Sequence, residues 1–201
     1  TSVILFLLCG ETMMKNKWQK IISILLIFIG SSLSLSTQAA VELPKSINYE
    51  GIELNLNGQG TRTMFFVKIY ESGLYLNSAN SSADEVINQD SAMAILLGVT
   101  SSMLTADSMK KAINEGFVKS TNDNTQPIAD QISQFMATLN DAVAVDDLFE
   151  FIYLPESGLD VIRNSKHLDT IEGLDFKKAF FGIWLSDNPV QKSLKKAMLG
   201  N

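Results

Sequence analysis

One stretch, residues 58–76 with the sequence GQGTRTMFFVKIYESGLYL, constrains the fold most strongly. Two glycines one residue apart and the lone Arg62 precede a dense apolar run. The run alternates Phe65, Val67 and Ile69 with Phe66, Lys68 and Tyr70. Its period of two and its aromatic and β-branched content predict a single β-strand. Arg62 and Tyr70 have the same parity, so an uninterrupted strand places both on one face. A guanidinium and a phenol in an apolar setting form a donor pair suited to a carboxylate or enolate oxygen.

The N-terminal segment predicts a leader. Met14 is followed by three lysines and an apolar run over residues 21–29, and small residues surround Ala39. A basic segment, a short apolar segment and a small-residue cleavage site predict a secretory signal peptide from Met14 to Ala39. We therefore expect a periplasmic or secreted protein whose residues 40–201 form a single domain. Residues 1–13 precede this start, and we expect them to be over-extended translation.

The rival interpretation of this segment is an uncleaved membrane anchor. Even the stretch over residues 21–35 is shorter than the ~20 apolar residues that a spanning helix needs. The signal peptide is the favoured reading, and no stable membrane span is expected after cleavage.

Charge and cysteine content exclude several function classes for the mature chain. Without Glu11 and the three leader lysines, the 16 basic and 22 acidic residues become 13 and 21, a net charge of −8. That balance argues against nucleic acid and anionic membrane surfaces as partners. The only cysteine, Cys9, precedes Met14, so the mature chain has no disulfide and no thiolate nucleophile. With His167 as the only histidine, we expect no metal site, and no motif indicates a cofactor.

The remaining periodicities predict a strand block, a helix pair, a strand block and a second helix pair. Strands are expected in a hairpin around Glu50-Gly51 and over residues 58–76, 92–99, 148–154, 159–162 and 167–171. Helices are expected over residues 82–88, 105–119, 127–139, 175–185 and 190–199, the last with Pro189 in its first turn. Blocks of this kind indicate an α+β fold rather than regular βαβ units.

Two segments together resemble the chalcone isomerase-like family. One is Gly58-x-Gly60-x-Arg62 leading into VKIYESGLY over residues 67–75, and the other is FGIWLSDNP over residues 181–189 leading into Ser193-Leu194. The similarity covers residues 43–200 and is greatest to the bacterial exported branch. It implies an open-faced β-sandwich, with helices on one face of an antiparallel sheet and a ligand cleft between them.

The resemblance also implies roles for individual residues. Arg62 matches the arginine that contacts the anionic end of the ligand. Tyr70 stands where the true isomerases carry a threonine that orders a catalytic water, and where the fatty-acid-binding members carry a tyrosine. The isomerases also use a tyrosine and an asparagine on the next helix, where this chain has Asn114 and no tyrosine. The chain thus resembles the non-catalytic fatty-acid-binding members more than the isomerases.

The favoured hypothesis is a non-enzymatic binder of a small amphipathic carboxylate such as a fatty acid. Its ligand-binding residues would be Arg62, Tyr70, Tyr75 and Asn114. The alternative is an intramolecular lyase or isomerase of chalcone isomerase type acting on an enone, with Arg62, Tyr70 and Asn114 as catalytic residues. A third hypothesis is an interaction protein whose cleft is closed by its own side chains. By residue type alone, Arg62 also fits a structural arginine paired with an acid.

Overall fold

The computed structural model describes residues 42–201. Their strands form one seven-stranded antiparallel sheet, in which the strands lie side by side in the order of the chain. The strands are β1 (Ser46–Tyr49), β2 (Ile52–Met64), β3 (Val67–Leu76), β4 (Met93–Val99), β5 (Leu148–Leu154), β6 (Gly158–Arg163) and β7 (Lys166–Ile171). The helices are α2 (Ala83–Asn88), α3 (Ala106–Ser120), the 3₁₀ turn η1 (Gln126–Ile128), α4 (Ala129–Ala137), α5 (Leu174–Leu185) and α6 (Lys192–Met198). The predicted signal peptide lies outside the described residues.

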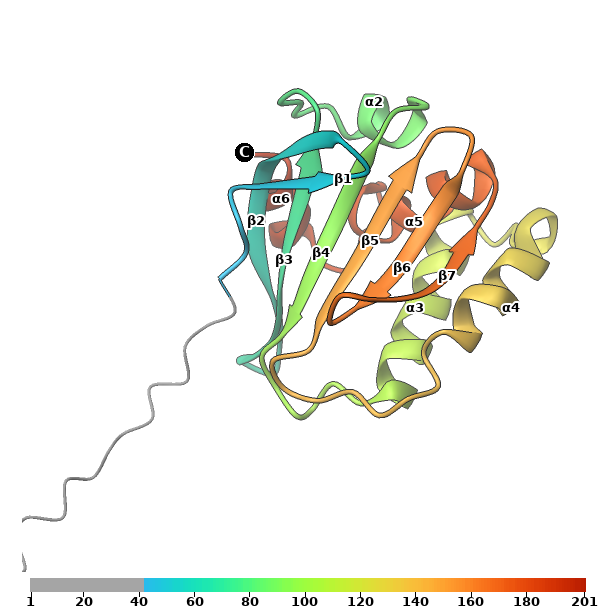
Figure 1. Cartoon of the computed structure of the whole chain (residues 1–201). Coiled ribbons are helices and arrows are strands. Elements are labelled where there is room, and N and C mark those ends of the chain that lie inside the picture. The colour runs from blue at the N-terminus through green and yellow to red at the C-terminus, as the bar shows by residue number, and fades with distance from the viewer. Residues whose placement is uncertain (1–41) are drawn as a thin grey trace, which may run out of the picture. The chain divides into compact units, whose positions relative to one another are not determined.

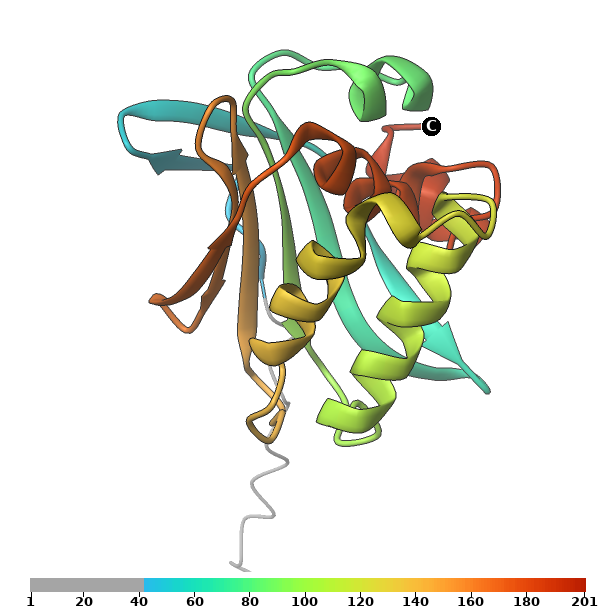
Figure 2. The same cartoon turned by 90° about the vertical axis from the view of Figure 1, so that its right-hand side faces the viewer.

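The helices cover one face of this sheet, and the β1–β2 hairpin bends across the other (Figures 1 and 2). Residues 40–201 form one compact unit with its own apolar core. The sheet alternates its side chains between that core and a smaller cluster beneath the β1–β2 hairpin, which includes Leu54, Tyr75, Ala94 and Ile152. The expected fold class, an α+β open-faced sandwich, is therefore confirmed.

An aromatic cluster fills the space between the sheet and the helices. Phe180 of α5 lies at its centre, with its ring centroid 5.0 Å from those of Phe135 and Phe151. Trp184 follows one turn later, 5.3 Å from Phe180. Each of these rings is almost completely buried. The space between the sheet and α5 is consequently a packed core at these rings.

Helix α5 is buried from Phe176 to Leu185 except at Lys178, although its sequence predicts a single apolar stripe. Gly116 of α3 lies against Ile183, and Gly182 lies against Ser120, so two glycines let these helices approach closely. Lys177 is also fully buried. Its ammonium can leave water because it donates to three carbonyls at the end of α2. A cation at a helix C-terminus satisfies carbonyls that have no partner within the helix.

Most predicted helices are confirmed, and the last one begins later than expected. Thr105 caps α3 through Ser108, and Ser82 caps α2 through the backbone of Glu85. In contrast, Pro189 lies before α6, which starts at Lys192. The backbone N–H of Val190 donates to Ile183 instead, so this segment folds back against α5. None of the helices in residues 42–201 is both long and apolar enough to cross a membrane.

The prediction of one strand over residues 58–76 is wrong, because the chain reverses in its middle. Phe65 and Phe66 form a two-residue turn between β2 and β3, and Met64 pairs with Val67 across it. Both phenylalanines have positive φ, 48° and 67°, as a type I′ turn requires. Such turns favour Asn-Gly, and aromatic side chains in this conformation are strained. Alternation alone could not reveal the turn, since no turn residue marks it.

We predict that the double substitution Phe65→Asn and Phe66→Gly stabilises residues 40–201. It should raise the free energy of unfolding by about 1–2 kcal/mol, because it removes two strained left-handed residues whose side chains make few contacts. Urea unfolding followed by circular dichroism measures the change. The matched control is Glu50→Asn, which also places Asn at the first, positive-φ position of a two-residue turn. That turn joins β1 to β2 and already has Gly51 at its second position. A destabilised double variant would contradict the prediction.

Candidate functional site

A pocket of about 330 Å³ opens where the ends of β2 and β3 face helix α3. Its walls are mainly apolar and are formed by Met64, Ile69, Met103, Leu104, Ala112 and Val190. Its polar groups come from Arg62, Tyr70, Ser108, Lys111 and Glu115. The arrangement of an apolar hollow with a few converging polar groups is typical of small-molecule sites.

Arg62 lies at this pocket with neutral partners only. Its Nη1 donates to the carbonyl of Thr63 at 2.7 Å and to Oε1 of Gln191 at 2.9 Å. Across residues 42–201, no carboxylate lies within ion-pair distance of the guanidinium. The half-buried charge is therefore oriented but not neutralised, and its other N–H groups remain available to a ligand.

Tyr70 lies directly opposite Arg62 as its cross-strand partner. A β-bulge at Ile69 brings Ile69 and Tyr70 to the pocket together. The Tyr70 hydroxyl accepts a hydrogen bond from Nε1 of Trp184 at 3.1 Å, and within the described residues its own hydrogen has no acceptor. Burial raises the pKa of Tyr70 to about 12, although the Trp184 hydrogen bond and the Arg62 charge act in the opposite direction. The phenol is consequently a protonated donor at neutral pH.

Gln191 holds the arginine in place, and sequence reasoning missed it. Its Oε1 accepts from Arg62 and from the backbone of Thr63, while its Nε2 donates to the carbonyl of Thr61 at 3.2 Å. The residue precedes α6, which packs on β2 where Gly58 and Gly60 leave room. A Cβ on Gly58 would meet the carbonyl oxygen of Ala197 at 2.1 Å. The two glycines of the Gly-x-Gly-x-Arg motif thus let α6 pack on β2, and Gln191 before α6 then positions Arg62.

Helix α3 contributes one of its faces to the pocket. Ser108, Lys111, Ala112 and Glu115 follow the three-four spacing of a helix face and line the wall. Asn114 does not lie on that face. It is exposed and outside the pocket, because each residue turns the helix by about 100°. The polar groups that this helix contributes to the pocket are Ser108, Lys111 and Glu115, which sequence reasoning did not single out.

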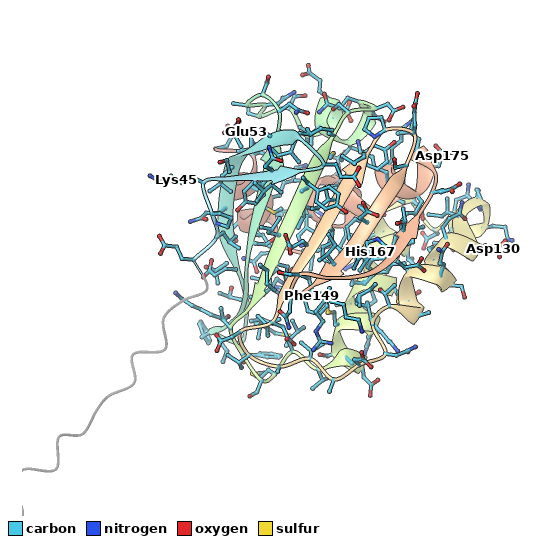
Figure 3. All side chains as sticks on the ribbon, viewed as in Figure 1. Lys45, Glu53, Asp130, Phe149, His167 and Asp175 are labelled. Atoms are coloured by element: carbon cyan, nitrogen blue, oxygen red, sulfur yellow. The ribbon has the colours of Figure 1, made fainter. Side chains whose placement is uncertain are left out.

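Tyr75 lies on the opposite face of the sheet from Arg62. Its ring belongs to the cluster under the β1–β2 hairpin, and its hydroxyl donates to the carbonyl of Pro44 at 2.7 Å. His167 of β7, labelled in Figure 3, also interacts on that face, where its Nε2 lies 3.0 Å from Asp160. Of the sequence-predicted site residues, the structure brings together only Arg62 and Tyr70.

A larger hollow of about 630 Å³ lies beside α2, α3 and α5. Charged side chains of both signs line it, and these are Asp84, Lys119, Asp175, Lys178 and Asp187. It lacks the continuous apolar wall that an amphipathic ligand needs. No three His, Cys, Asp or Glu side chains in residues 42–201 are grouped so as to hold a metal ion. The pocket at Arg62 is accordingly the better candidate for small-molecule binding.

We predict that Tyr70 makes the stability of the protein sensitive to alkaline pH. Its folded pKa of about 12 lies above the ordinary tyrosine pKa of 10.0, so its stabilising contribution is complete below pH 10 and is lost as pH rises through 12. Tyr70→Phe should remove this loss, which is on the order of 2 kcal/mol. Urea unfolding of both proteins between pH 9 and 12 measures it. Equal slopes for the two proteins would exclude a buried phenol.

Comparisons with known proteins identify the family and the fold. The model of the chalcone isomerase-like family matches residues 35–200. No curated protein matches the sequence. Among solved structures, that of an Arabidopsis thaliana fatty-acid binding protein superposes with a TM-score of 0.62 at 13% identity, covering 78% of this chain and 90% of that chain. At this identity the superposition shows the fold. Because the family model spans the entire folded unit, the chain belongs to the chalcone isomerase-like family.

Proposed function

We propose that this protein binds a small amphipathic carboxylate in the pocket at Arg62, without catalysing a reaction. The observation that carries the proposal is a pair of donors without acceptors at one end of an apolar hollow. These are the free N–H groups of Arg62 and the hydroxyl hydrogen of Tyr70. A carboxylate has two oxygens and can accept from both groups at once.

The electrostatics of the pocket favour an anionic head group. Taking a charged side chain partly out of water costs free energy unless an opposite charge compensates it. Arg62 has only neutral oxygens as partners among the described residues, and Lys111 adds a second positive charge to the lining. Glu115 is the only acid in that lining. A bound carboxylate would supply the missing negative charge.

The size of the pocket favours a short or medium acyl chain. Its volume of about 330 Å³ lies near the lower end of ~300–1,000 Å³, the range for small-molecule sites. Behind Tyr70, the core around Trp184 and Phe180 is closely packed, so a long chain has no room to enter it. We therefore propose a ligand of about the length of octanoate, held with its carboxylate on Arg62 and Tyr70.

The enzymatic alternative has less support than binding. It assigns Asn114 a catalytic role, and that side chain is exposed outside the pocket. Tyr70 occupies the position at the pocket floor where, by the resemblance, an isomerase would order water. The similarly folded Arabidopsis thaliana protein is described as a fatty-acid binding protein, which agrees with binding as the function proposed for this chain.

We predict that Arg62→Gln weakens octanoate binding by about tenfold to a hundredfold, since it removes a charge-assisted hydrogen bond but keeps a polar, uncharged side chain. Isothermal titration calorimetry on residues 40–201 gives the dissociation constants. Lys196→Gln, an exposed site on α6 away from the pocket, is the matched loss of one positive charge. If both variants bind octanoate as the wild type does, Arg62 is not the head-group site. If the wild type binds neither octanoate nor longer acids, the proposed function is wrong.

We also propose that the protein is exported, with Met14 to Ala39 removed. The basic, apolar and small-residue segments of this leader support the proposal. Expression of the chain from Met14 in a bacterial host should give a periplasmic protein that begins at Ala40 or Val41. Intact-mass spectrometry of the periplasmic fraction measures this. A membrane-bound product that retains residues 14–39 would indicate an anchor instead.

A further inference from the structure

The turn between β2 and β3 exposes the most prominent apolar surface of the described residues. Met64, Phe65, Phe66 and Val67, which we call the hairpin tip, have exposed fractions of 38%, 83%, 105% and 39%. Figure 2 shows this hairpin extending from the lower part of the sheet, away from the core. An isolated exposed apolar residue is ordinary, but two adjacent phenylalanines on a protruding turn form a contiguous patch.

The fold itself does not require these two phenylalanines. Their side chains are almost entirely exposed, so they contribute little to packing. Their positive φ values make them poorer turn residues than Asn or Gly. Residues that break a local rule without a structural gain are expected at functional sites. The tip therefore has a role outside the folded core.

The hairpin tip lies at the mouth of the pocket. Met64 belongs both to the tip and to the pocket lining. Met103, from the loop between β4 and α3, is 44% exposed and lines the same pocket from the other side. The apolar interior of the pocket is thus continuous with the exposed apolar surface around its opening.

We propose that the hairpin tip inserts into the interfacial layer of a phospholipid bilayer and places the pocket mouth at the membrane surface. Phe65 and Phe66 would enter the boundary between head groups and acyl chains, with Met64, Val67 and Met103 around them. The docking follows from the exposed tip alone. Its consequence, exchange of an amphipathic carboxylate directly between pocket and bilayer, rests on the proposed function.

The size and charge of this surface favour a bilayer over a protein partner. A stable protein interface involves about 20–30 residues and ~800 Å² on each side. Within residues 42–201 the exposed large apolar side chains number five; four project from a narrow turn, and the fifth, Met103, lies in the loop between β4 and α3. Interfacial binding scales with the buried apolar area and the electrostatic attraction to lipid, so it does not require the large, shape-matched contact of a protein interface. Lys68 beside the tip and Lys111 at the pocket supply positive charges, which suit lipid phosphates.

The overall charge of the protein restricts the kind of membrane. The net charge of −8 for residues 40–201 opposes attraction to a strongly anionic surface. Binding should consequently depend on insertion of the phenylalanines rather than on long-range electrostatics. We expect association with zwitterionic phosphatidylcholine vesicles that changes little when anionic lipid or salt is added.

Vesicle flotation with residues 40–201 tests this docking. This compact unit lacks the apolar run at residues 21–29, which would bind lipid by itself. The wild type should float with phosphatidylcholine vesicles, and Phe65→Asn with Phe66→Gly should lower the partition coefficient at least tenfold. Since this pair suits the turn, its unfolding midpoint should equal or exceed that of the wild type, so lost binding cannot be attributed to unfolding.

Three outcomes would overturn the proposal. The first is a wild type that is absent from the floated fraction, and the second is a double variant that floats equally well. The third is a wild-type dimer, seen by sedimentation velocity without vesicles, that the double variant does not form; a second copy of the chain then covers the tip.

Two further measurements separate the docking from the proposed ligand. Arg62→Gln should float like the wild type while losing octanoate affinity. The double variant should keep octanoate affinity in solution, but its uptake of fatty acid from vesicles should no longer accelerate with vesicle concentration. If neither the wild type nor the variants bind octanoate while the wild type still floats, the proposed function fails and the docking stands. If octanoate binds and the wild type does not float, the docking fails alone.

Discussion

The close approach of α6 to β2 determines how the candidate site is built. Gly58 and Gly60 have no side chains in the way, so the end of the helix rests directly on the strand. That contact fixes Gln191 beside Thr61 and Thr63, where its amide bonds both the strand backbone and Arg62. The glycines near the start of the folded chain therefore position Arg62 by way of a helix more than a hundred residues away in the sequence. The arginine is positioned by packing and not by an ion pair.

The selectivity of the pocket follows from what surrounds that charge. Neutral oxygens orient the guanidinium without cancelling its charge, and Tyr70 adds a donor whose raised pKa keeps it protonated. The aromatic core behind Trp184 closes the inner end and limits the length of any tail. Charge at one end and packed rings behind it are the features on which the proposal of a small amphipathic ligand rests.

The β2–β3 hairpin carries both of the surfaces on which the proposals rest. Its bulge at Ile69 directs Tyr70 into the pocket, and its turn carries two phenylalanines away from the core. Bulges and strained turns weaken local structure, and the long pairing of β2 with β3 together with α6 supports them. In the proposed arrangement, one supersecondary element holds the head group and meets the membrane.

The sequence by itself determined the fold class and most element boundaries, and it placed Arg62 and Tyr70 on one face, although it assigned both to a single strand instead of two paired strands. Caps, turns and apolar periods depend on residues close together in the sequence, and these signals can be read directly. The two family motifs lie near the two ends of the folded unit. Only the tertiary structure decided that residues 58–76 are a hairpin, because two phenylalanines give no turn signal and alternation continues through them. It also separated Tyr75 and Asn114 from the pocket and added Gln191 and Trp184. Which face a residue occupies depends on bulges and on contacts between distant segments, and residue spacing along the chain does not encode these.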